Sequence, residues 1–364
     1  MNDLSREVYC LLGLPFDAVT LSDAEAQVRM AAQNRVPCFL STPNLNFLIG
    51  CLDDGEFRES VLESDLSVVD GMPLVWLAGL LGVPLRERVA GSTLFDSLRQ
   101  TNKQPLSVYF FGGADGVAEV ACQRLNSSSS GLSGAGYETP GFGTVTEMSS
   151  DETLARINAS GADFLVVALG AKKGQAWIMR NRAQLDVPVV SHLGAVVNFV
   201  AGTVSRAPGW MQRVGLEWLW RIKEEPGLWR RYFSDGSALL RLLFVRVLPY
   251  ARYLRKNRPS QAQLEQAQYI QDDLPDITRL LLTGTWGEGN LYRLTPVLSE
   301  MVAGGKDLDL DLNKVSYIDS AFIGRLMLVR KELRQQGRRL HVTRPSSAVR
   351  QIFFWNCAEY LFEG

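Results

Sequence analysis

Phe164-Leu-Val-Val-Ala-Leu169 is a run of six apolar residues, short for a helix and typical of a strand that is buried on both faces. Similar runs recur in the first 200 residues, at 37–42, 66–70, 106–111 and 187–191. Helical patterns lie between some of them, as at 116–125 and 175–185. Short buried strands that alternate with helices predict an α/β fold with a mostly parallel sheet covered on both faces. The serine- and glycine-rich stretches 127–131 and 134–143 are predicted to be surface loops.

The composition of the chain changes twice beyond residue 200. Between residues 205 and 258 there are twelve Arg or Lys against four Asp or Glu, and aromatic residues are frequent. Residues 259–271 are polar, and from 272 onward strand and helix patterns alternate again. The sequence therefore predicts four parts: a core at 1–204, a basic aromatic appendage at 205–258, a linker at 259–271 and a small α/β domain at 272–364.

The bulk composition excludes several classes of protein. The 364 residues carry a net charge of only -1, so general attraction to nucleic acid is not expected. Five scattered cysteines without a CxxC pair, and only two histidines, argue against a zinc site and for a reduced, cytoplasmic protein. The N-terminus has no signal-peptide pattern, and the most apolar stretch, 238–253, is interrupted by arginines. We therefore expect no membrane-spanning segment, although the chain can lie on a membrane.

A single carboxylate stands at the end of one strand-like run. Residues 62–69 read as a strand, and Asp70-Gly71 would end it and hold the acid at its tip. Thr42 and Asn44 follow the preceding apolar run in the same way. An acid near hydroxyl and amide groups suits sugar transfer, because the attacking hydroxyl needs a base and the sugar needs neutral partners. Alternatively, Asp70 only caps a helix that begins near Pro73.

Two loops between strands and helices could hold an anion. Gly112 and Gly113 follow a strand and precede a helix, where backbone N–H groups can approach a phosphate, although such glycines also make ordinary tight turns. Lys172 and Lys173 lie in a second such loop and could either neutralise a diphosphate or remain solvated. His192 ends another strand, and we interpret it as a hydrogen-bonded structural residue rather than a catalyst.

The basic aromatic appendage has three interpretations. Arginines beside aromatic side chains can lie in a membrane interface, pack as an ordinary helix pair, or bind single-stranded nucleic acid. Tryptophan and tyrosine prefer the headgroup zone, where arginines can pair with lipid phosphates. We therefore favour a membrane surface over packing, and packing over nucleic acid.

Taken together, the motifs of residues 10–235 resemble the WecG/TagA/CpsF family of bacterial glycosyltransferases. The matching pieces are Thr42-Pro-Asn44, Asp65 with Val69-Asp-Gly71, Arg88-Val-x-Gly91, Phe111-Gly-Gly113, Gly194 with Ala201-Gly202, Arg206-Ala-Pro-x-Trp210, and Gly215-Leu-Glu-Trp-Leu-Trp-Arg221 with Glu225-Pro226. Their order and spacing are more specific than any one of them. The resemblance implies a Rossmann-like catalytic domain with a helical C-terminal appendage that closes over the active site at the membrane.

The resemblance also implies a reaction. Members of this family transfer an N-acetylmannosamine-type sugar, or a related one such as glucose, from a UDP donor to a polyprenyl-diphosphate-linked acceptor. They act by inversion, without an essential metal or other cofactor, at the inner face of the cytoplasmic membrane. The expected role is in exopolysaccharide or other cell-envelope polysaccharide synthesis, with no nucleic-acid partner.

The same resemblance assigns roles to individual residues. Asp70 would be the catalytic base, and Arg88 would stabilise the charge that develops on the departing UDP. The expected substrate-binding residues are Thr42, Asn44, Gly112, Gly113, Lys173, Arg206, Arg213 and Arg221. The chain departs from the family pattern at Gly174 and Gln175, where Gln and Glu are usual, and at Asn198, where Asp is common.

The last ninety or so residues resemble a STAS domain, the fold of anti-sigma-factor antagonists. Asp311-Leu-Asn-Lys-Val-Ser-Tyr-Ile-Asp-Ser-Ala-Phe-Ile-Gly324 matches its strand, turn and helix-start signature. Ser320 occupies a position that many such domains phosphorylate, which implies a regulatory module with a protein partner or kinase. Alternatively, Ser320 only caps the helix from Ala321 onward. A competing hypothesis for the whole chain is a non-catalytic signalling scaffold in which the transferase domain has decayed.

Overall fold

The computed structural model describes residues 3–101, 104–128 and 130–363, and these form two compact units. The larger unit consists of Val19–Val75 and Leu85–Ser237. The smaller unit consists of Met1–Ala18, Trp76–Pro84 and Ala238–Gly364. The chain passes between the units four times. Two of these passages lie within helices, α4 (Met72–Leu81) and α12 (Trp229–Leu242), and the other two lie between residues 18 and 19 and between residues 84 and 85.

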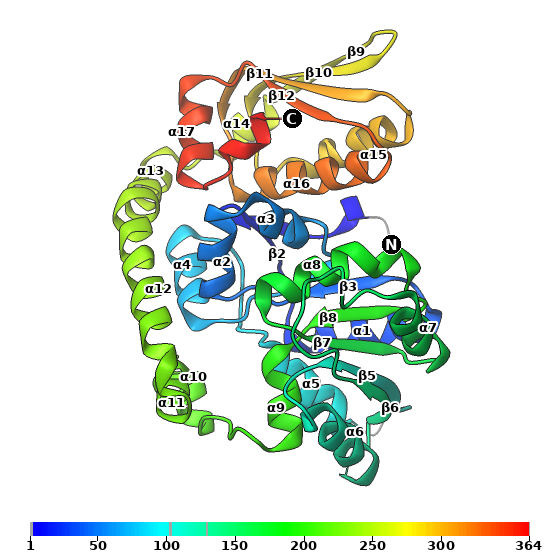
Figure 1. Cartoon of the computed structure of the whole chain (residues 1–364). Helices are drawn as coiled ribbons and strands as arrows, with labels where there is room; N and C mark the ends of the chain where they lie inside the picture. Colours follow the sequence, from blue (N-terminus) through cyan, green and yellow to red (C-terminus); the bar gives the residue numbers. More distant parts are fainter. Residues whose placement is uncertain (1–2, 102–103, 129, 364) are drawn as a thin grey trace. The chain divides into compact units, whose positions relative to one another are not determined.

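The larger unit is built on a six-stranded parallel sheet in the order β4-β3-β8-β7-β5-β6 (Figure 1). Its strands are β3 (Cys38–Ser41), β4 (Leu66–Ser67), β5 (Leu106–Gly112), β6 (Leu132–Glu138), β7 (Phe164–Ala168) and β8 (Val189–His192). The central strand β7 is apolar along its whole length and almost fully buried, because helices cover both faces of the sheet. This confirms the α/β class and the parallel sheet predicted from the apolar runs.

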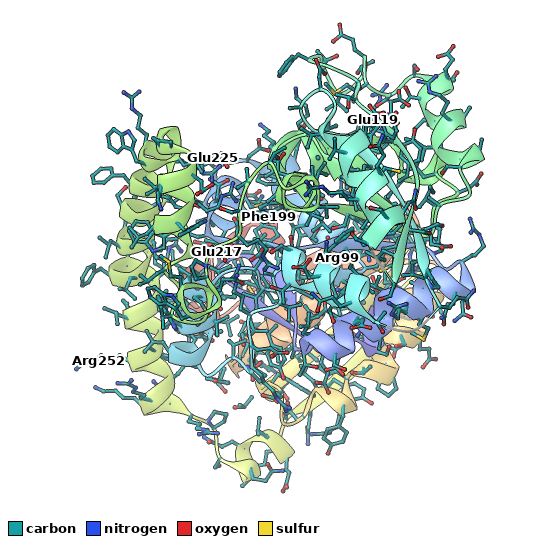
Figure 2. All side chains as sticks on the ribbon, turned by 90° about the horizontal axis from the view of Figure 1, so that it is seen from below. Arg99, Glu119, Phe199, Glu217, Glu225 and Arg252 are labelled. Carbon is teal, nitrogen blue, oxygen red and sulfur yellow. The ribbon has the colours of Figure 1, made fainter. Side chains whose placement is uncertain are left out.

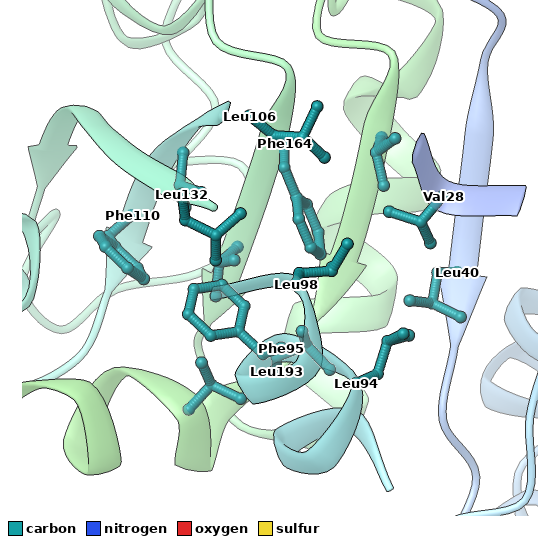
Figure 3. Close-up of a cluster of buried hydrophobic side chains, with 14 of the residues drawn as sticks. Val28, Leu40, Leu94, Phe95, Leu98, Leu106, Phe110, Leu132, Phe164 and Leu193 are labelled. Atoms are coloured by element: carbon teal, nitrogen blue, oxygen red, sulfur yellow. The ribbon is translucent and has the colours of Figure 1, made fainter. Parts of the chain in front are cut away.

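Two separate hydrophobic clusters hold the helices to the two faces of this sheet. One face is covered by α1 (Leu21–Asn34), α5 (Gly91–Gln100), α6 (Val117–Ser128) and α9 (Gly194–Ala201). Figure 3 shows the centre of this cluster, where the Phe95 ring lies 6.2 Å from the rings of Phe110 and Phe164. The other face is covered by α7 (Asp151–Ala159) and α8 (Ala171–Asn181), and there Trp177 packs 4.5 Å from Phe111. Alternate residues of each strand therefore serve opposite cores.

Two predictions about the edges of this sheet are wrong. Residues 134–143 are not simply a loop, because β6 pairs with β5 through Glu138. A Cβ at Gly134 would lie only 2.4 Å from Cys122 Sγ, so close packing requires glycine here. Because glycines interrupt the apolar pattern that is typical of a strand, the sequence predicts a loop at this place. The strand expected at 62–69 is reduced to β4, because α3 (Gly55–Leu62) runs into its first residue.

Further helices of the larger unit lie at two places in the chain. The helix α2 (Leu45–Asp53) leads into α3 between β3 and β4, whereas α10 (Gly209–Arg213), α11 (Glu217–Glu224) and the first part of α12 follow β8, the last strand of the sheet in the sequence. The buried carboxylate of Asp235 in α12 accepts hydrogen bonds of 3.2 and 3.4 Å from the side-chain amide of Asn46 in α2. The expected helical appendage is therefore present.

The smaller unit contains a four-stranded sheet in the order β12-β11-β10-β9. Its strands are β9 (Gln268–Asp273), β10 (Ile277–Thr285), β11 (Asp307–Tyr317) and β12 (Leu340–Thr343), of which β9 alone is antiparallel to its neighbour. Its helices are α13 (Leu248–Asn257), α14 (Gln261–Glu265), α15 (Thr295–Ala303), α16 (Ser320–Gln335) and α17 (Ser347–Trp355). This is the small α/β domain predicted at the end of the chain.

The domain boundaries differ from those predicted at both ends of the core. The hairpin β1 (Val8–Leu11) and β2 (Leu14–Asp17) packs in the smaller unit, against α16. A Cβ at Gly324 of α16 would lie 2.2 Å from the Val8 carbonyl oxygen, so only glycine allows this approach. The buried Lys331 and Asp3 side chains form an ion pair of 2.5 Å beside it. Residues 3–18 therefore belong with the C-terminal domain rather than with the predicted core at 1–204.

The predicted appendage and linker also contribute to the smaller unit. In α13, Tyr250 stacks 5.7 Å from Trp355, and Tyr253 stacks 6.3 Å from Tyr317. The polar stretch 259–271 contains α14 and the beginning of β9 instead of an unstructured linker. Its strand was missed because every residue of β9 is exposed, which leaves no apolar alternation to detect.

The N-cap residue of α16 is Asp319, which lies one residue before Ser320, the cap considered as an alternative from the sequence. The Asp319 carboxylate accepts the Phe322 N–H at 2.9 Å and the Glu288 N–H at 2.8 Å. Burial raises the pKa of Asp319 to about 6 despite these hydrogen bonds. Ser320 is therefore the first helical residue and not the cap.

Candidate active site

The polar residues that follow β3 and β4 lie side by side. Val68 donates its backbone N–H to the Ser41 carbonyl at 3.0 Å, and Asp70 donates to the Pro43 carbonyl at 3.0 Å. The chain after β4 therefore continues alongside the chain after β3. Because the strands are parallel, both segments emerge at the carboxyl edge of the sheet, where α/β proteins bind their ligands.

Asp70 and Arg88 form an ion pair at this edge. Val89 donates its N–H to the Val69 carbonyl at 2.9 Å, which holds the Arg88 segment against the Asp70 segment. The Arg88 Nε and Nη2 atoms donate to Asp70 Oδ1 at 3.3 and 3.2 Å. The backbone N–H of Gly91, the first residue of α5, lies close enough to the Asp70 carboxylate to lower its pKa. These contacts hold Asp70 between Arg88 and α5. Asp70 therefore does not serve as the cap of the helix near Pro73.

The surroundings of this pair favour a proton-accepting carboxylate. The side chains of Arg88 and Asp70 are only 16% and 22% exposed. Burial raises the pKa of Asp70, the Arg88 guanidinium partly opposes this, and the nearby Glu217 carboxylate raises it further. Burial opposes the charge on Arg88, but Asp70 and Glu217 together raise the pKa of its guanidinium. Asp70 is thus a stronger base than an exposed carboxylate while still facing a fixed cation.

Glu217 is the site residue that sequence reasoning missed. Its Oε2 atom lies 2.7 Å from Arg88 Nη2, and its side chain is 18% exposed. It begins α11, and Figure 2 labels it together with Glu225, which follows the end of that helix. The sequence signal for Glu217 was its place inside the Gly215–Arg221 motif, in which only Arg221 was predicted to bind substrate.

Thr42 and Asn44 lie where the sequence predicted, after β3. Thr42 is buried, and a Cβ on Gly91 would lie 3.3 Å from its hydroxyl. The side-chain oxygen of Asn44 accepts the Phe47 N–H at 3.1 Å and so caps α2. The nearest atom to a Cβ on Gly71 is the Asn44 Cβ at 3.8 Å, which places Asn44 directly beside the Asp70 segment.

The two predicted anion loops have different structures. Gly112 and Gly113 both have positive φ values, 101° and 92°, and Gly113 donates its N–H to the Ala168 carbonyl at 2.9 Å. This tight turn brings the end of β5 against the end of β7. Lys173 donates to the Gly143 carbonyl at 2.9 Å, and Lys172 pairs with Asp54. Both lysines therefore have protein partners rather than a shared anion site.

The appendage arginines also have partners within the larger unit. Arg206 pairs with Asp96 and donates to Thr93 Oγ1 and Gln212 Oε1, each at 3.2 Å. Arg221 pairs with Glu225 at 3.1 Å. The Nε atoms of both arginines are buried without a hydrogen-bond partner in the described part of the chain, so each retains a donor for a ligand. The side chain of Arg213 lies outside the described residues.

His192 and the altered loop after β7 pack together. A Cβ at Gly174 would lie 2.3 Å from the His192 ring, so the glycine accommodates the imidazole. His192 Nε2 is buried without a hydrogen-bond partner among the described residues, and burial lowers the pKa of His192 to about 4. Gln175, also buried, donates to Ser41 Oγ at 2.9 Å. The predicted hydrogen-bonded role of His192 is not what the structure shows, because the ring is held by packing.

The lowered pKa of His192 predicts acid destabilisation of the larger unit. The folded state favours the neutral ring, whereas the unfolded chain gains a proton near pH 6.5. Stability is therefore lost as the pH falls from 6.5 towards 4, by up to about 3 kcal/mol. We expect the His192→Gln variant to lack this part of the pH dependence in denaturant titrations at several pH values. Parallel pH profiles for the variant and the parent protein would contradict the assignment.

Two further features bear on substrates. The residues described include no group of three or more His, Cys, Asp or Glu side chains arranged to hold a metal ion. Among the same residues, no helix has both the length and the apolar character needed to cross a membrane.

Comparison with known proteins identifies relatives for both parts of the chain. Residues 9–253 match the profile of the glycosyl transferase WecG/TagA/CpsF family, and residues 271–354 match that of the Mlab STAS domain. A protein of Bacillus spizizenii, named N-acetylglucosaminyldiphosphoundecaprenol N-acetyl-beta-D-mannosaminyltransferase, is 30% identical over 54% of this chain and 75% of its own length. Proteins of the same name from Bacillus subtilis and Staphylococcus aureus MW2 are 27% and 24% identical, over 57% and 61% of this chain and 80% and 85% of their own lengths.

Proposed function

Because the chain belongs to the WecG/TagA/CpsF family of glycosyltransferases and carries a C-terminal STAS domain, we propose that it transfers an N-acetylmannosamine-type or related sugar from UDP to a polyprenyl-diphosphate-linked acceptor. The names of its relatives support N-acetylglucosaminyl-diphosphoundecaprenol as the acceptor. The expected setting is cell-envelope polysaccharide synthesis at the inner face of the cytoplasmic membrane.

The observation that carries this proposal is the Asp70–Arg88 pair at the carboxyl edge of the sheet. Asp70 accepts the proton of the acceptor hydroxyl as its oxygen attacks the anomeric carbon of the donor. The bond between that carbon and the UDP oxygen breaks, and the electron pair leaves with the diphosphate. Arg88 stabilises this negative charge, which is largest in the transition state. Attack opposite the leaving group inverts the anomeric configuration.

The neighbouring residues supply binding in this mechanism. Thr42 and the amide nitrogen of Asn44 contact a sugar ring beside Asp70. The buried Nε atoms of Arg206 and Arg221 donate to donor phosphates once their present partners rearrange. Lys173 has a smaller role than the sequence predicted, because it holds the Gly143 loop instead.

Metal removal tests this distribution of roles. If arginines neutralise the leaving diphosphate, UDP release in the presence of lipid-linked acceptor should be unchanged by excess EDTA. The Arg88→Met variant, which keeps a long side chain without the charge, should lose turnover by about a hundredfold. Loss of activity with EDTA that added Mg²⁺ restores would contradict metal-independent transfer.

The raised pKa of Asp70 predicts the pH dependence of transfer. Only the deprotonated carboxylate accepts the proton, so turnover should fall as the pH drops through the pKa of Asp70. Because burial raises that pKa above 3.8, the acid limb of kcat should lie above the usual range of an exposed aspartate. A limb at or below pH 3.8 in an enzyme that stays folded would remove Asp70 from this role.

The exposed aromatic residues of the larger unit support membrane docking. On the helices α10 to α12, Trp210, Trp218, Leu219, Trp229 and Phe233 are exposed. Cationic side chains lie over aromatic rings there: Arg230 is 5.7 Å from the Trp229 ring, and Lys223 is 4.8 Å from Trp220. Apolar rings flanked by cations are suited to the headgroup region of an anionic bilayer. We propose that this surface brings the enzyme to its lipid-linked acceptor.

Vesicle binding tests the membrane surface. The Trp229→Ala/Phe233→Ala double variant should bind anionic vesicles at least about tenfold more weakly in a sedimentation assay, because two exposed rings no longer insert. Tyr292→Ala is a matched control, since Tyr292 is 72% exposed and Phe233 73%, but Tyr292 lies in the C-terminal domain. Equal binding by the double variant and the parent protein would contradict the proposal.

We propose a regulatory or docking role for the C-terminal domain, with a protein partner or a kinase acting at Ser320. The position of Ser320 in the first turn of α16 supports it, because a phosphate there would meet the helix dipole favourably. The neighbouring Asp319 and Glu288 would repel the same phosphate. Phosphorylation mapping of the protein from its native cells is the direct test.

A further inference from the structure

One nitrogen of Arg88 serves two carboxylates. Its Nη2 atom lies 3.2 Å from Asp70 Oδ1 and 2.7 Å from Glu217 Oε2. All three side chains are less than a quarter exposed, so water screens their charges only in part. The cluster already carries one more negative than positive charge before any substrate arrives.

A donor diphosphate cannot simply be added to this cluster. In the proposed function, Arg88 faces the diphosphate of UDP, which brings further negative charge to the same guanidinium. Two carboxylates and a diphosphate around one arginine would repel one another strongly in a partly buried site. One of the present partners of Arg88 must therefore leave when the donor binds.

The structure indicates which partner leaves. Asp70 is fixed through its backbone N–H to the Pro43 carbonyl, and the carbonyl of the preceding Val69 accepts the Val89 N–H. Glu217 instead begins the eight-residue helix α11, which has no buried residue. A segment with little buried surface moves at lower cost than one hydrogen-bonded into the sheet edge.

We propose that Glu217 is an internal competing anion, which occupies the Arg88 guanidinium in the absence of donor and is displaced by the diphosphate of UDP. This inference rests on the proposed function, since it assigns the ligand of the same site. Displacement of Glu217 releases α11 from the sheet edge, so donor binding changes the position of the appendage. The donor-free enzyme thus keeps its cationic site covered.

Equilibrium titration of the full-length protein with UDP tests this inference. The Glu217→Gln variant should bind UDP about tenfold more tightly, because the competing charge is gone and the side-chain shape is kept. Glu217→Asp, which keeps the charge on a shorter side chain, should bind with an affinity between the two. Glu224→Gln is the matched control, since Glu224 is an exposed residue of the same helix, and its affinity should equal that of the parent protein.

A second readout separates competition from a purely structural role. Without the Glu217 charge, the acid limb of kcat/KM, which reports the donor-free enzyme, should move to lower pH, because that charge helps to raise the pKa of Asp70 before the donor displaces it. Unchanged or weaker UDP binding by Glu217→Gln, with the melting temperature preserved, would overturn the inference and leave the proposed function intact. Failure of the parent protein and every variant to bind UDP would overturn the proposed donor and this inference together.

Discussion

The Asp70→Asn variant is expected to lose sugar transfer by about a thousandfold while it remains folded. Asparagine has nearly the shape of aspartate and can accept the Arg88 hydrogen bonds, but it cannot take the proton of the attacking hydroxyl. Because burial disfavours the charged form of Asp70, its replacement should not lower the melting temperature greatly. UDP release with lipid-linked acceptor measures the first effect, and thermal unfolding measures the second.

Asp163→Asn is the control for this substitution. Asp163 precedes β7, at the amino edge of the same sheet, and accepts the Ser107 N–H at 2.9 Å and the Ser107 hydroxyl at 2.8 Å. It is another partly buried aspartate that accepts backbone and side-chain donors, but it lies away from the Asp70–Arg88 pair. Its variant should lose some stability and keep its turnover. Comparable activity of Asp70→Asn and the parent protein would exclude Asp70 as the base.

The Gly324→Ala variant is expected to destabilise the C-terminal domain by about 3 kcal/mol. The added methyl group would lie 2.2 Å from the Val8 carbonyl oxygen and 3.1 Å from Tyr9 Cα. Both are backbone atoms of the N-terminal hairpin, so the hairpin must move away from α16. That movement also strains the buried ion pair between Lys331 and Asp3. Denaturant unfolding measures the change.

Gly236→Ala is the control for this prediction. Gly236 lies inside α12, and no atom beyond its chain neighbours and its own helix backbone lies within 4 Å of the position that its Cβ would take, so alanine there should be neutral or slightly stabilising. Faster proteolysis near residue 18 in Gly324→Ala alone would show that the hairpin has left α16. Equal stability of the two variants would contradict the close packing of hairpin and helix.

The local elements of the fold were predictable because each has its own pattern. Buried strands such as Phe164–Ala168 are apolar without interruption, and the helical pattern at 116–125 marks α6. The strand β6 was not predictable, because it contains glycines such as Gly134, which pack closely and have no side chain to contribute to an apolar pattern. The alternative in which Ser320 caps α16 is one residue late, because Asp319 and Ser320 are both good capping residues and the sequence does not choose between them.

The contacts between distant segments were less predictable. The sequence placed Asp70 and Arg88 on loops after apolar runs, but Arg88 lies between α4 and α5 rather than after a strand. The backbone hydrogen bond from Val89 to Val69 brings it to Asp70. Periodicity gives no sign that the hairpin at the start of the chain packs on α16, more than 300 residues later, because that depends on one glycine and one buried ion pair. Glu217 was overlooked for a similar reason, since its partner lies on another element.

Product analysis tests the central claim most directly. The full-length protein is mixed with UDP-N-acetylmannosamine and N-acetylglucosaminyl-diphospho-polyprenol, and the lipid product is examined by mass spectrometry and NMR. The account predicts one added N-acetylhexosamine, one UDP released for each transfer, and a β linkage from the α-linked donor. A product that retains the α configuration, or no product from any UDP-sugar with a folded enzyme that binds vesicles, would contradict it.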